Sequence, residues 1–137
     1  MSKAETSNVA QKGSILVVDD EQRIADTLTL ILRSQGYNVQ VAYDGASGLE
    51  IYRTMVPDLV ISDVVMPRMN GVDMAIAIRK EFPNARILLF SGQAVSADML
   101  DEARGRGYDF ELLAKPVHPN ELLKKVNELI GTQVLRT

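Results

Sequence analysis

In the stretch ILVVDDEQ, Ile15 to Gln22, four apolar residues run directly into three acidic ones. A short continuous apolar run is typical of a strand that is buried on both faces of a sheet. Asp19, Asp20 and Glu21 then stand where this strand leaves the core, and crowded carboxylates repel one another. The stretch therefore predicts a buried strand whose end requires a positively charged partner.

The composition is typical of one globular domain. The chain has 137 residues, of which 46% are hydrophobic and 24% are charged, and this length is sufficient for one hydrophobic core. The formal net charge of −3 provides no overall basic field for direct binding of nucleic acid. The absence of cysteine excludes disulfides, thiolate catalysis and Cys-ligated zinc, and the single histidine, His118, argues against a histidine-rich metal site.

The ends of the chain are expected to lie outside the folded domain. Residues 1–13 are polar and lack the apolar core of a signal peptide. No run of about eighteen apolar residues predicts a membrane-spanning helix. We expect a disordered N-terminal tail at residues 1–13, one domain at residues 14–130 and a short C-terminal tail at residues 131–137. The expected location is the cytoplasm, with no membrane partner.

Five strand-like runs alternate with stretches of helical spacing. The predicted strands are Ile15–Asp19, Asn38–Ala42, Leu59–Asp63, Arg86–Ser91 and Phe110–Ala114. Gly36 suits the end of the first helix, Asp44, Asn70 and Ser96 suit the N-caps of the next three, and Pro119 suits the start of the last. Five strand–helix repeats predict an α/β fold with a parallel sheet that is covered on both faces.

The composition of the strands predicts their order. ILVV, LVIS and ILLF are continuous apolar runs, whereas NVQVA alternates and FELLA is interrupted by Glu111. Strands 2 and 5 are therefore expected at the edges of the sheet. This arrangement fits the doubly wound, flavodoxin-like order 2-1-3-4-5, in which ligands bind beyond the carboxyl ends of strands 1 and 3.

Polar side chains stand at the carboxyl ends of four predicted strands: Asp19 and Asp20, Asp63, Ser91 and Lys115. Three carboxylates without Cys or His ligands favour a hard cation, and Mg²⁺ usually binds one or two carboxylates together with waters and a phosphate. A carboxylate such as Asp63 can attack phosphorus to form an acyl phosphate. Lys115 and Ser91 would stabilise the phosphoryl oxygens. The pattern predicts a phosphoryl-accepting site.

At this point the sequence resembles the receiver domain of two-component response regulators, over residues 14–130, nearly the whole chain. The resemblance rests on VVDDE, ISDVVMPRMNG, LLFSG and LLAKP, in that order and at the expected strand ends. It implies a signalling module that accepts a phosphoryl group from a histidine kinase or phosphotransfer protein. An effector would then bind to the face formed by the fourth helix, the fifth strand and the last helix.

The resemblance also implies a role for each residue of the site. Asp63 would be the phosphoacceptor, Ser91 the hydroxyl that swings toward the phosphoryl group, and Lys115 its ion-pair partner, with the Lys115–Pro116 bond typically cis. The implied Mg²⁺ ligands are Asp19, partly through water, Asp20, Asp63 and the backbone carbonyl of Val65. Val65 and Gln93 would lie near the route of the water that hydrolyses the acyl phosphate. Glu21 is expected to face solvent in the first helical turn, where its charge suits the helix dipole.

Two features of the sequence leave alternatives open. Leu112 stands where most receivers carry an aromatic residue that rotates on activation, so that either Phe110 or Tyr108 substitutes for it or the aromatic switch is absent. The segment at residues 71–78, GVDMAIAI, is apolar nearly all round, and it either meets a partner or packs within the domain.

Three other functions compete with a single-domain receiver. The chain could be a fragment of a longer response regulator with an output domain. A Mg²⁺-dependent phosphatase of the haloacid dehalogenase type also forms an aspartyl phosphate, but it requires Asp-x-Asp after the first strand, where this chain has adjacent acids. A structural interaction domain that uses the fold without phosphorylation is the third alternative.

Overall fold

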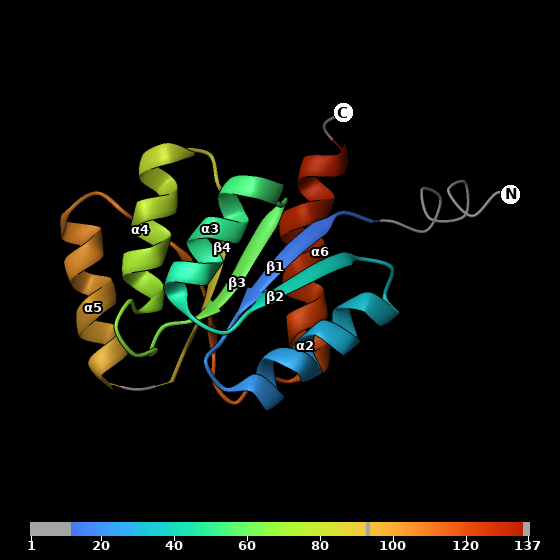
Figure 1. Ribbon diagram of the computed structural model, residues 1–137, viewed down its shortest axis with the longest axis horizontal. Helices are drawn as coiled ribbons and strands as arrows, with labels where there is room; N and C mark the ends of the chain where they lie inside the picture. Colours follow the sequence, from blue (N-terminus) through green and yellow to red (C-terminus); the bar gives the residue numbers. More distant parts are fainter. Residues whose placement is uncertain (1–11, 93, 136–137) are drawn as a thin grey trace, which may run out of the picture.

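The computed structural model describes residues 12–92 and 94–135, in which strands and helices alternate along the chain (Figure 1). The strands are β1 (Ser14–Val18), β2 (Asn38–Ala42), β3 (Leu59–Asp63), β4 (Ile87–Ser91) and β5 (Glu111–Ala114). The helices are α2 (Gln22–Ser34), α3 (Gly45–Met55), α4 (Gly71–Glu81), α5 (Ala94–Gly105) and α6 (Pro119–Leu135). The bounds of the strands differ from the predicted ones by no more than one residue at each end.

The strands form one parallel sheet in the order β2-β1-β3-β4-β5, which confirms the predicted topology. Every residue of β3 is buried, whereas the edge strand β5 has exposed or partly exposed side chains throughout. The register pairs Ile61 of β3 with Val17 of β1 and with Leu88 of β4. Because the strands are parallel, their carboxyl ends meet at one edge of the sheet.

Helices cover both faces of the sheet (Figure 1). Successive side chains of a strand point to opposite faces, so Leu16 and Val18 pack in the cluster under α3, α4 and α5. Ile15 and Val17 pack in the other cluster, under α2 and α6. The continuous apolar run of β1 is thus buried on both sides.

Helix α4 contains the apolar segment at residues 71–78, for which the sequence left open either contact with a partner or packing within the domain. It packs against α3 on one side and α5 on the other, and most of its apolar side chains are buried: Val72, Met74, Ala75, Ile76 and Ile78. The apolar character of this segment is therefore explained by packing within the domain.

Most of the residues that were predicted to begin or end a helix are confirmed in that position. The Asp44 side chain accepts a hydrogen bond from the Ser47 amide at 2.7 Å, and the Asn70 side chain accepts one from the Asp73 amide at 2.8 Å. Gly36 follows α2 with φ of 96°, a conformation that glycine adopts without steric cost. The prediction for Ser96 was wrong: α5 begins at Ala94, so Ser96 lies inside the first turn.

The ends of the domain extend beyond the predicted limits. Lys12 donates a backbone hydrogen bond to Gly36 at 3.0 Å, and Gly13 accepts one from Asn38 at 2.9 Å, so these two residues are bonded to the turn before β2 and to its first residue. Residues 1–11 of the expected N-terminal tail lie outside the described residues. Helix α6 continues to Leu135, past Ile130 where the helix was expected to end. No helix in the described part of the chain is long and apolar enough to cross a membrane.

Candidate functional site

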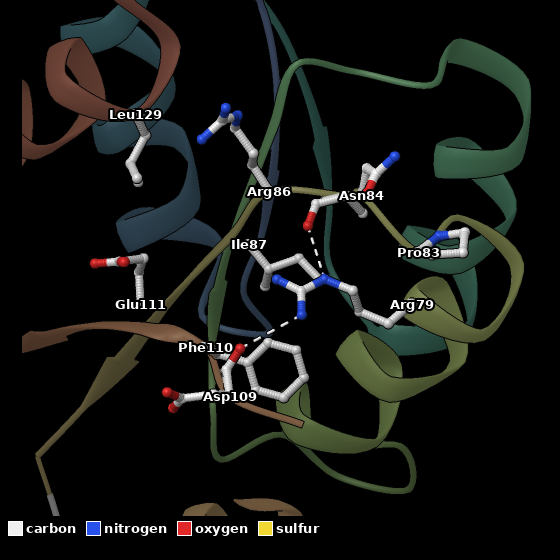
Figure 2. A pocket seen from close by; sticks show the side chains of 10 residues that line it. Arg79, Pro83, Asn84, Arg86, Ile87, Asp109, Phe110, Glu111 and Leu129 are labelled. Atoms are coloured by element: carbon white, nitrogen blue, oxygen red, sulfur yellow. Dashed lines mark hydrogen bonds between the residues drawn. The ribbon is translucent and has the colours of Figure 1, made fainter. Parts of the chain in front are cut away.

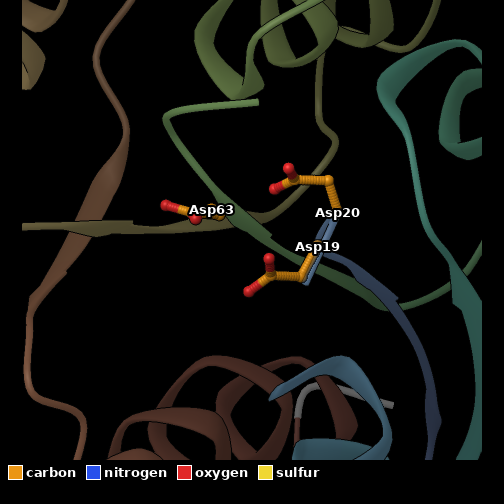
Figure 3. Close-up of side chains that lie close together, drawn as sticks. All are labelled: Asp19, Asp20 and Asp63. Atoms are coloured by element: carbon orange, nitrogen blue, oxygen red, sulfur yellow. The ribbon is translucent and has the colours of Figure 1, made fainter. Parts of the chain in front are cut away.

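Three carboxylates gather where β1 and β3 end (Figure 3). Asp19 and Asp20 follow β1 directly, and Asp63 is the last residue of β3, the neighbouring strand. One oxygen of each side chain lies within 4.8 Å of the others. The structure thus brings together the three acids that the sequence placed at one edge of the sheet.

Asp19 lies beneath the site and is fully buried. Its Oδ1 accepts a hydrogen bond from the Glu21 amide at 2.9 Å, whereas its Oδ2 has no hydrogen-bond partner among the described residues. Burial raises the pKa of Asp19 to about 6 against the lowering effect of the Glu21 amide, and the negative charges of Asp63 and Asp20 add to the rise. A buried acceptor without a partner is costly, and a cation at this position would remove the cost.

Asp63 is paired with Lys115. The Lys115 Nζ lies 3.0 Å from the Asp63 Oδ2, and the Val65 amide donates to the Asp63 Oδ1 at 3.4 Å. The Lys115 amide donates to the carbonyl of Ser91 at 3.3 Å, and the Lys115–Pro116 bond is cis, as the resemblance implied. The nucleophile candidate is therefore 4% exposed and is held between an ammonium group and a backbone amide.

Asp20, Asp63 and Lys115 face a cavity of about 350 Å³ at the carboxyl edge of the sheet. Its lining consists of Asp20, Glu21, Asp63, Val65, Gly92, Ser96 and Lys115. A Cβ atom at Gly92 would lie 2.9 Å from the Cβ of Lys115, so the absence of a side chain there lets the lysine enter the site. The Asp63 carboxylate and the Lys115 ammonium therefore both open onto this cavity.

Not every residue that was predicted for the site lines the cavity. Ser91 is half-buried at the end of β4, one residue past Phe90, the register partner of Asp63, and neither Ser91 nor the buried Asp19 is part of the lining. Gln93 lies outside the described residues. Val65 is 41% exposed and lines the cavity.

The sequence reasoning missed three residues of the lining. Glu21 was expected in the first turn of the helix, but it is the exposed N-cap residue of α2 and contributes to the rim of the cavity. Gly92 is the last residue of the LLFSG motif, and this motif was the signal that could have identified it. No local signal indicated Ser96, which reaches the cavity only because α5 begins two residues before it.

A larger cavity, of about 730 Å³, lies at the opposite end of the sheet, where β4 and β5 begin (Figure 2). Arg79 donates to the carbonyl of Ala85 at 2.8 Å and to that of Asp109 at 3.4 Å, and its guanidinium carbon lies 5.1 Å from the centre of the Phe110 ring. Through these contacts Arg79 links α4 to the segments that lead into β4 and β5. The side chains around it carry both signs of charge, so we assign this cavity no ligand.

Phe110, which lies in this region, is one of the residues that could substitute for the aromatic residue missing at position 112. Phe110 is buried ahead of β5 and packs under Arg79, at the end of the strand away from Lys115. Leu112 lies within β5, pairs in register with Leu89 and is 38% exposed. Phe110 thus occupies a structural position in the core, and Leu112 presents an aliphatic side chain where most receivers have an aromatic one.

Known proteins resemble this chain in sequence and in structure. Residues 15–127 match the family described as the response regulator receiver domain. The chemotaxis protein CheY of Thermotoga maritima is 32% identical over 116 residues, which are 84% of this chain and 95% of CheY. A crystal structure of a response regulator receiver domain protein from Clostridium thermocellum superposes with a TM-score of 0.80 at 31% identity, covering 90% of this chain and 98% of that one.

Longer regulators match as well. The probable transcriptional regulatory protein TcrX of Mycobacterium tuberculosis is 32% identical over 120 residues, and the DNA-binding response regulator MtrA of the same species is 33% identical over 112 residues. The matches cover 88% and 82% of this chain, which spans about half the length of these two relatives. The fold, the acidic site and these similarities agree: the chain belongs to the receiver domain family of response regulators, the signalling domains of two-component systems.

Proposed function

We propose that this receiver domain accepts a phosphoryl group on Asp63 from a histidine kinase or phosphotransfer protein and signals through a separate effector. The observation that carries the proposal is the environment of the Asp63 carboxylate. It faces a cavity, with two further acids on one side and the Lys115 ammonium 3.0 Å away on the other. Apart from catalysing its own phosphorylation and dephosphorylation, such a domain turns over no substrate.

The proposed step is a displacement at phosphorus. A carboxylate oxygen of Asp63 attacks the phosphorus atom of a phosphohistidine, the bond from phosphorus to the imidazole nitrogen breaks, and the leaving nitrogen keeps its electron pair. The product is an acyl phosphate on Asp63. Lys115 pairs with the new phosphoryl oxygens, and Ser91 donates a hydrogen bond to one of them.

The residues around Asp63 fit a bound Mg²⁺. The carboxylates of Asp19, Asp20 and Asp63 and the carbonyl of Val65 form the all-oxygen donor set that this ion prefers. The buried Oδ2 of Asp19, which has no partner among the described residues, is an acceptor that the ion would satisfy. Mg²⁺, when bound, offsets the negative charge that the carboxylates and the phosphoryl oxygens bring together.

The phosphorylated state would be detected at the face formed by α5, β5 and α6. The phosphoryl group biases an equilibrium between two conformations in which Ser91 and the connection to α5 shift. Leu112, exposed on β5, is part of this face and provides an apolar contact for an effector.

Intact-mass measurement tests the proposal directly. After incubation with Mg²⁺ and a small phosphodonor such as acetyl phosphate, the wild type should gain the mass of one phosphoryl group, and Asp63→Asn should gain none. Asp98→Asn, which removes an exposed acid on α5, is the matched control and should be phosphorylated like the wild type. No adduct on the wild type, or the same adduct on Asp63→Asn, would contradict the proposal.

A second measurement addresses the alternative of an interaction domain that works without phosphorylation. Binding of a captured effector should be stronger for the phosphorylated wild type than for Asp63→Asn under the same conditions. Equal binding by the two proteins would favour that alternative.

A further inference from the structure

We infer that Ser96 is a second hydroxyl of this site and donates a hydrogen bond to the phosphoryl group on Asp63. The inference rests on the proposed function and adds to it a binding residue that belongs to α5. Ser91, the hydroxyl predicted from the sequence, belongs instead to β4.

The side chain of Ser96 is buried but has no partner. The residue is 1% exposed, and its Oγ makes no hydrogen bond among the described residues. A buried hydroxyl without a partner is uncommon, because leaving it unsatisfied costs free energy that a hydrogen bond would recover. This feature requires an explanation beyond packing.

The position of Ser96 in its helix explains why no backbone group satisfies it. Hydroxyl side chains within a helix commonly donate to the carbonyl four residues earlier, as Thr27 does to Arg23 and Thr29 does to Ala25 in α2, both at 2.8 Å. Ser96 stands in the first turn of α5, and the residue four positions before it, Gly92, precedes the helix. The hydroxyl therefore remains available to a group from outside the helix.

The acceptor for the Ser96 hydroxyl would lie in the cavity. Ser96 lines the same cavity of about 350 Å³ as Asp63 and Lys115. A serine hydroxyl is a donor that suits an anionic oxygen, and a phosphoryl group presents three such oxygens beside Asp63. The first turn of a helix also carries partial positive charge from its free amides, which favours an anion on this side of the cavity.

The consequence of this contact is a direct link from the phosphoryl group to α5. A hydrogen bond from Ser96 would draw the first turn of α5 toward the site when Asp63 is phosphorylated. The signal would then reach the α5, β5 and α6 face through the helix itself as well as through the movement of Ser91 in β4.

The test compares Ser96→Ala with the wild type, and trifluoroberyllate with Mg²⁺ serves as the probe in place of the phosphoryl group. Isothermal titration should show about tenfold weaker binding of trifluoroberyllate to Ser96→Ala, the loss expected for one hydrogen bond to a charged group. Binding of Mg²⁺ alone should be unchanged. The urea midpoint of unfolding should not fall, because alanine removes an unsatisfied hydroxyl and leaves the helix intact.

Ser34→Ala is the matched control. Ser34 lies exposed at the end of α2 and donates to the carbonyl of Ile31. This is the opposite end of α2 from Glu21, which lines the cavity, so the loss of the Ser34 hydroxyl should leave trifluoroberyllate binding as in the wild type. Equal affinity of Ser96→Ala and the wild type for trifluoroberyllate would overturn the inference. A lower urea midpoint with unchanged trifluoroberyllate affinity would overturn it as well, in favour of a structural role.

The same experiment separates this inference from the proposed function. A wild type that neither binds trifluoroberyllate nor gains the phosphoryl adduct overturns both. A wild type that does both, with a Ser96→Ala variant that binds the probe equally well, overturns the role of Ser96 alone.

Discussion

The Nζ of Lys115 lies 3.0 Å from the Oδ2 of Asp63 and supplies the cationic side chain in the lining of the acidic cavity. The two residues are 52 positions apart in the sequence and meet because β3 and β5 both end at the same edge of the sheet. The pair offsets part of the repulsion among Asp19, Asp20 and Asp63. It also holds the proposed nucleophile in place before a phosphoryl group arrives.

Lys115→Met should therefore destabilise the metal-free protein. Removing the ammonium leaves Asp63, which is 4% exposed, beside two other acids without its cation. We expect the free energy of unfolding to fall by about 1–2 kcal/mol, less than for a fully buried pair because Lys115 is partly exposed. Urea denaturation in the presence of a chelator measures the change.

Lys125→Met is the control for this loss of charge. Lys125 pairs with Glu111 at 3.4 Å, and that carboxylate is largely exposed, so the change should lower the free energy of unfolding by less than about 0.5 kcal/mol. Equal losses in the free energy of unfolding for Lys115→Met and Lys125→Met would show that the Asp63–Lys115 pair stabilises the protein no more than an exposed ion pair does.

Asp19→Asn should stabilise the metal-free protein at neutral pH. The amide oxygen can still accept from the Glu21 amide, but the buried charge is gone. The pKa of Asp19 rises from 3.8 to about 6 on folding, and a shift of this size corresponds to a destabilisation of up to about 3 kcal/mol when the carboxyl is ionised. We expect Asp19→Asn to raise the free energy of unfolding at pH 7.5 by about 1–3 kcal/mol.

The sign of the pH dependence provides the check. Between pH 3.8 and about 6 the folded state binds more protons at Asp19 than the unfolded state does, so this group lowers stability as the pH rises. The advantage of Asp19→Asn should shrink as the pH falls from 7.5 toward 4, in urea titrations with a chelator present. An advantage that does not depend on pH would exclude the ionisation of Asp19 as its cause.

Mg²⁺ should stabilise the wild type. A ligand that binds only the folded state raises the free energy of unfolding by about 2.7 kcal/mol at one hundred times its dissociation constant. Asp20→Asn removes an exposed ligand of the proposed site and should lose most of the Mg²⁺-dependent rise in Tm. Glu50→Gln, at an exposed position on α3, should retain it, and loss of the rise in both variants would point to a general effect of charge.

Gly71→Ala should destabilise the domain strongly. A Cβ atom at this position would lie 2.1 Å from the backbone oxygen of Asp63, so the variant must displace the end of β3 or the start of α4. We expect a loss of about 3 kcal/mol in the free energy of unfolding. Gly105→Ala is the control, because a Cβ atom there would meet nothing within 4 Å, and its urea midpoint should be unchanged or slightly higher.

Val65→Asn should change the lifetime of the phosphorylated state without changing stability. Val65 is 41% exposed and lines the cavity beside Asp63, where a polar side chain can orient the water that attacks phosphorus. We expect a measurable change in the rate at which the phosphoryl adduct disappears, followed by intact mass after removal of the donor. An unaltered decay rate would exclude this position as a control point.

Local patterns in the sequence were sufficient to predict most of the fold. The buried runs ILVV, LVIS and ILLF and the broken pattern of the outer strands indicated the order of the sheet. Asp44 and Asn70 were identified as caps because a capping side chain bonds to amides only two or three residues away. Such features depend on neighbours along the chain, so they can be inferred without the tertiary structure.

The convergence of Asp19, Asp20, Asp63 and Lys115 was also predictable, because parallel strands place their carboxyl ends at one edge. The orientation of each side chain at that edge was not. Asp19 and Asp20 are adjacent in sequence, yet the first is fully buried and the second is exposed. Which of the two lies beneath the site depends on the strands and helices packed around it.

Periodicity and strand composition were enough to predict acids, a hydroxyl and an amine at the ends of strands in a doubly wound sheet, since both can be followed along the chain without knowledge of its tertiary contacts. That Ser96 of α5 reaches the cavity and that Gly92 leaves room for Lys115 became evident only from the folded arrangement. The folded arrangement also covers the apolar surface of α4 with α3 and α5. These features arise from packing between segments distant in sequence, where the space available to each side chain is set by its neighbours across the fold.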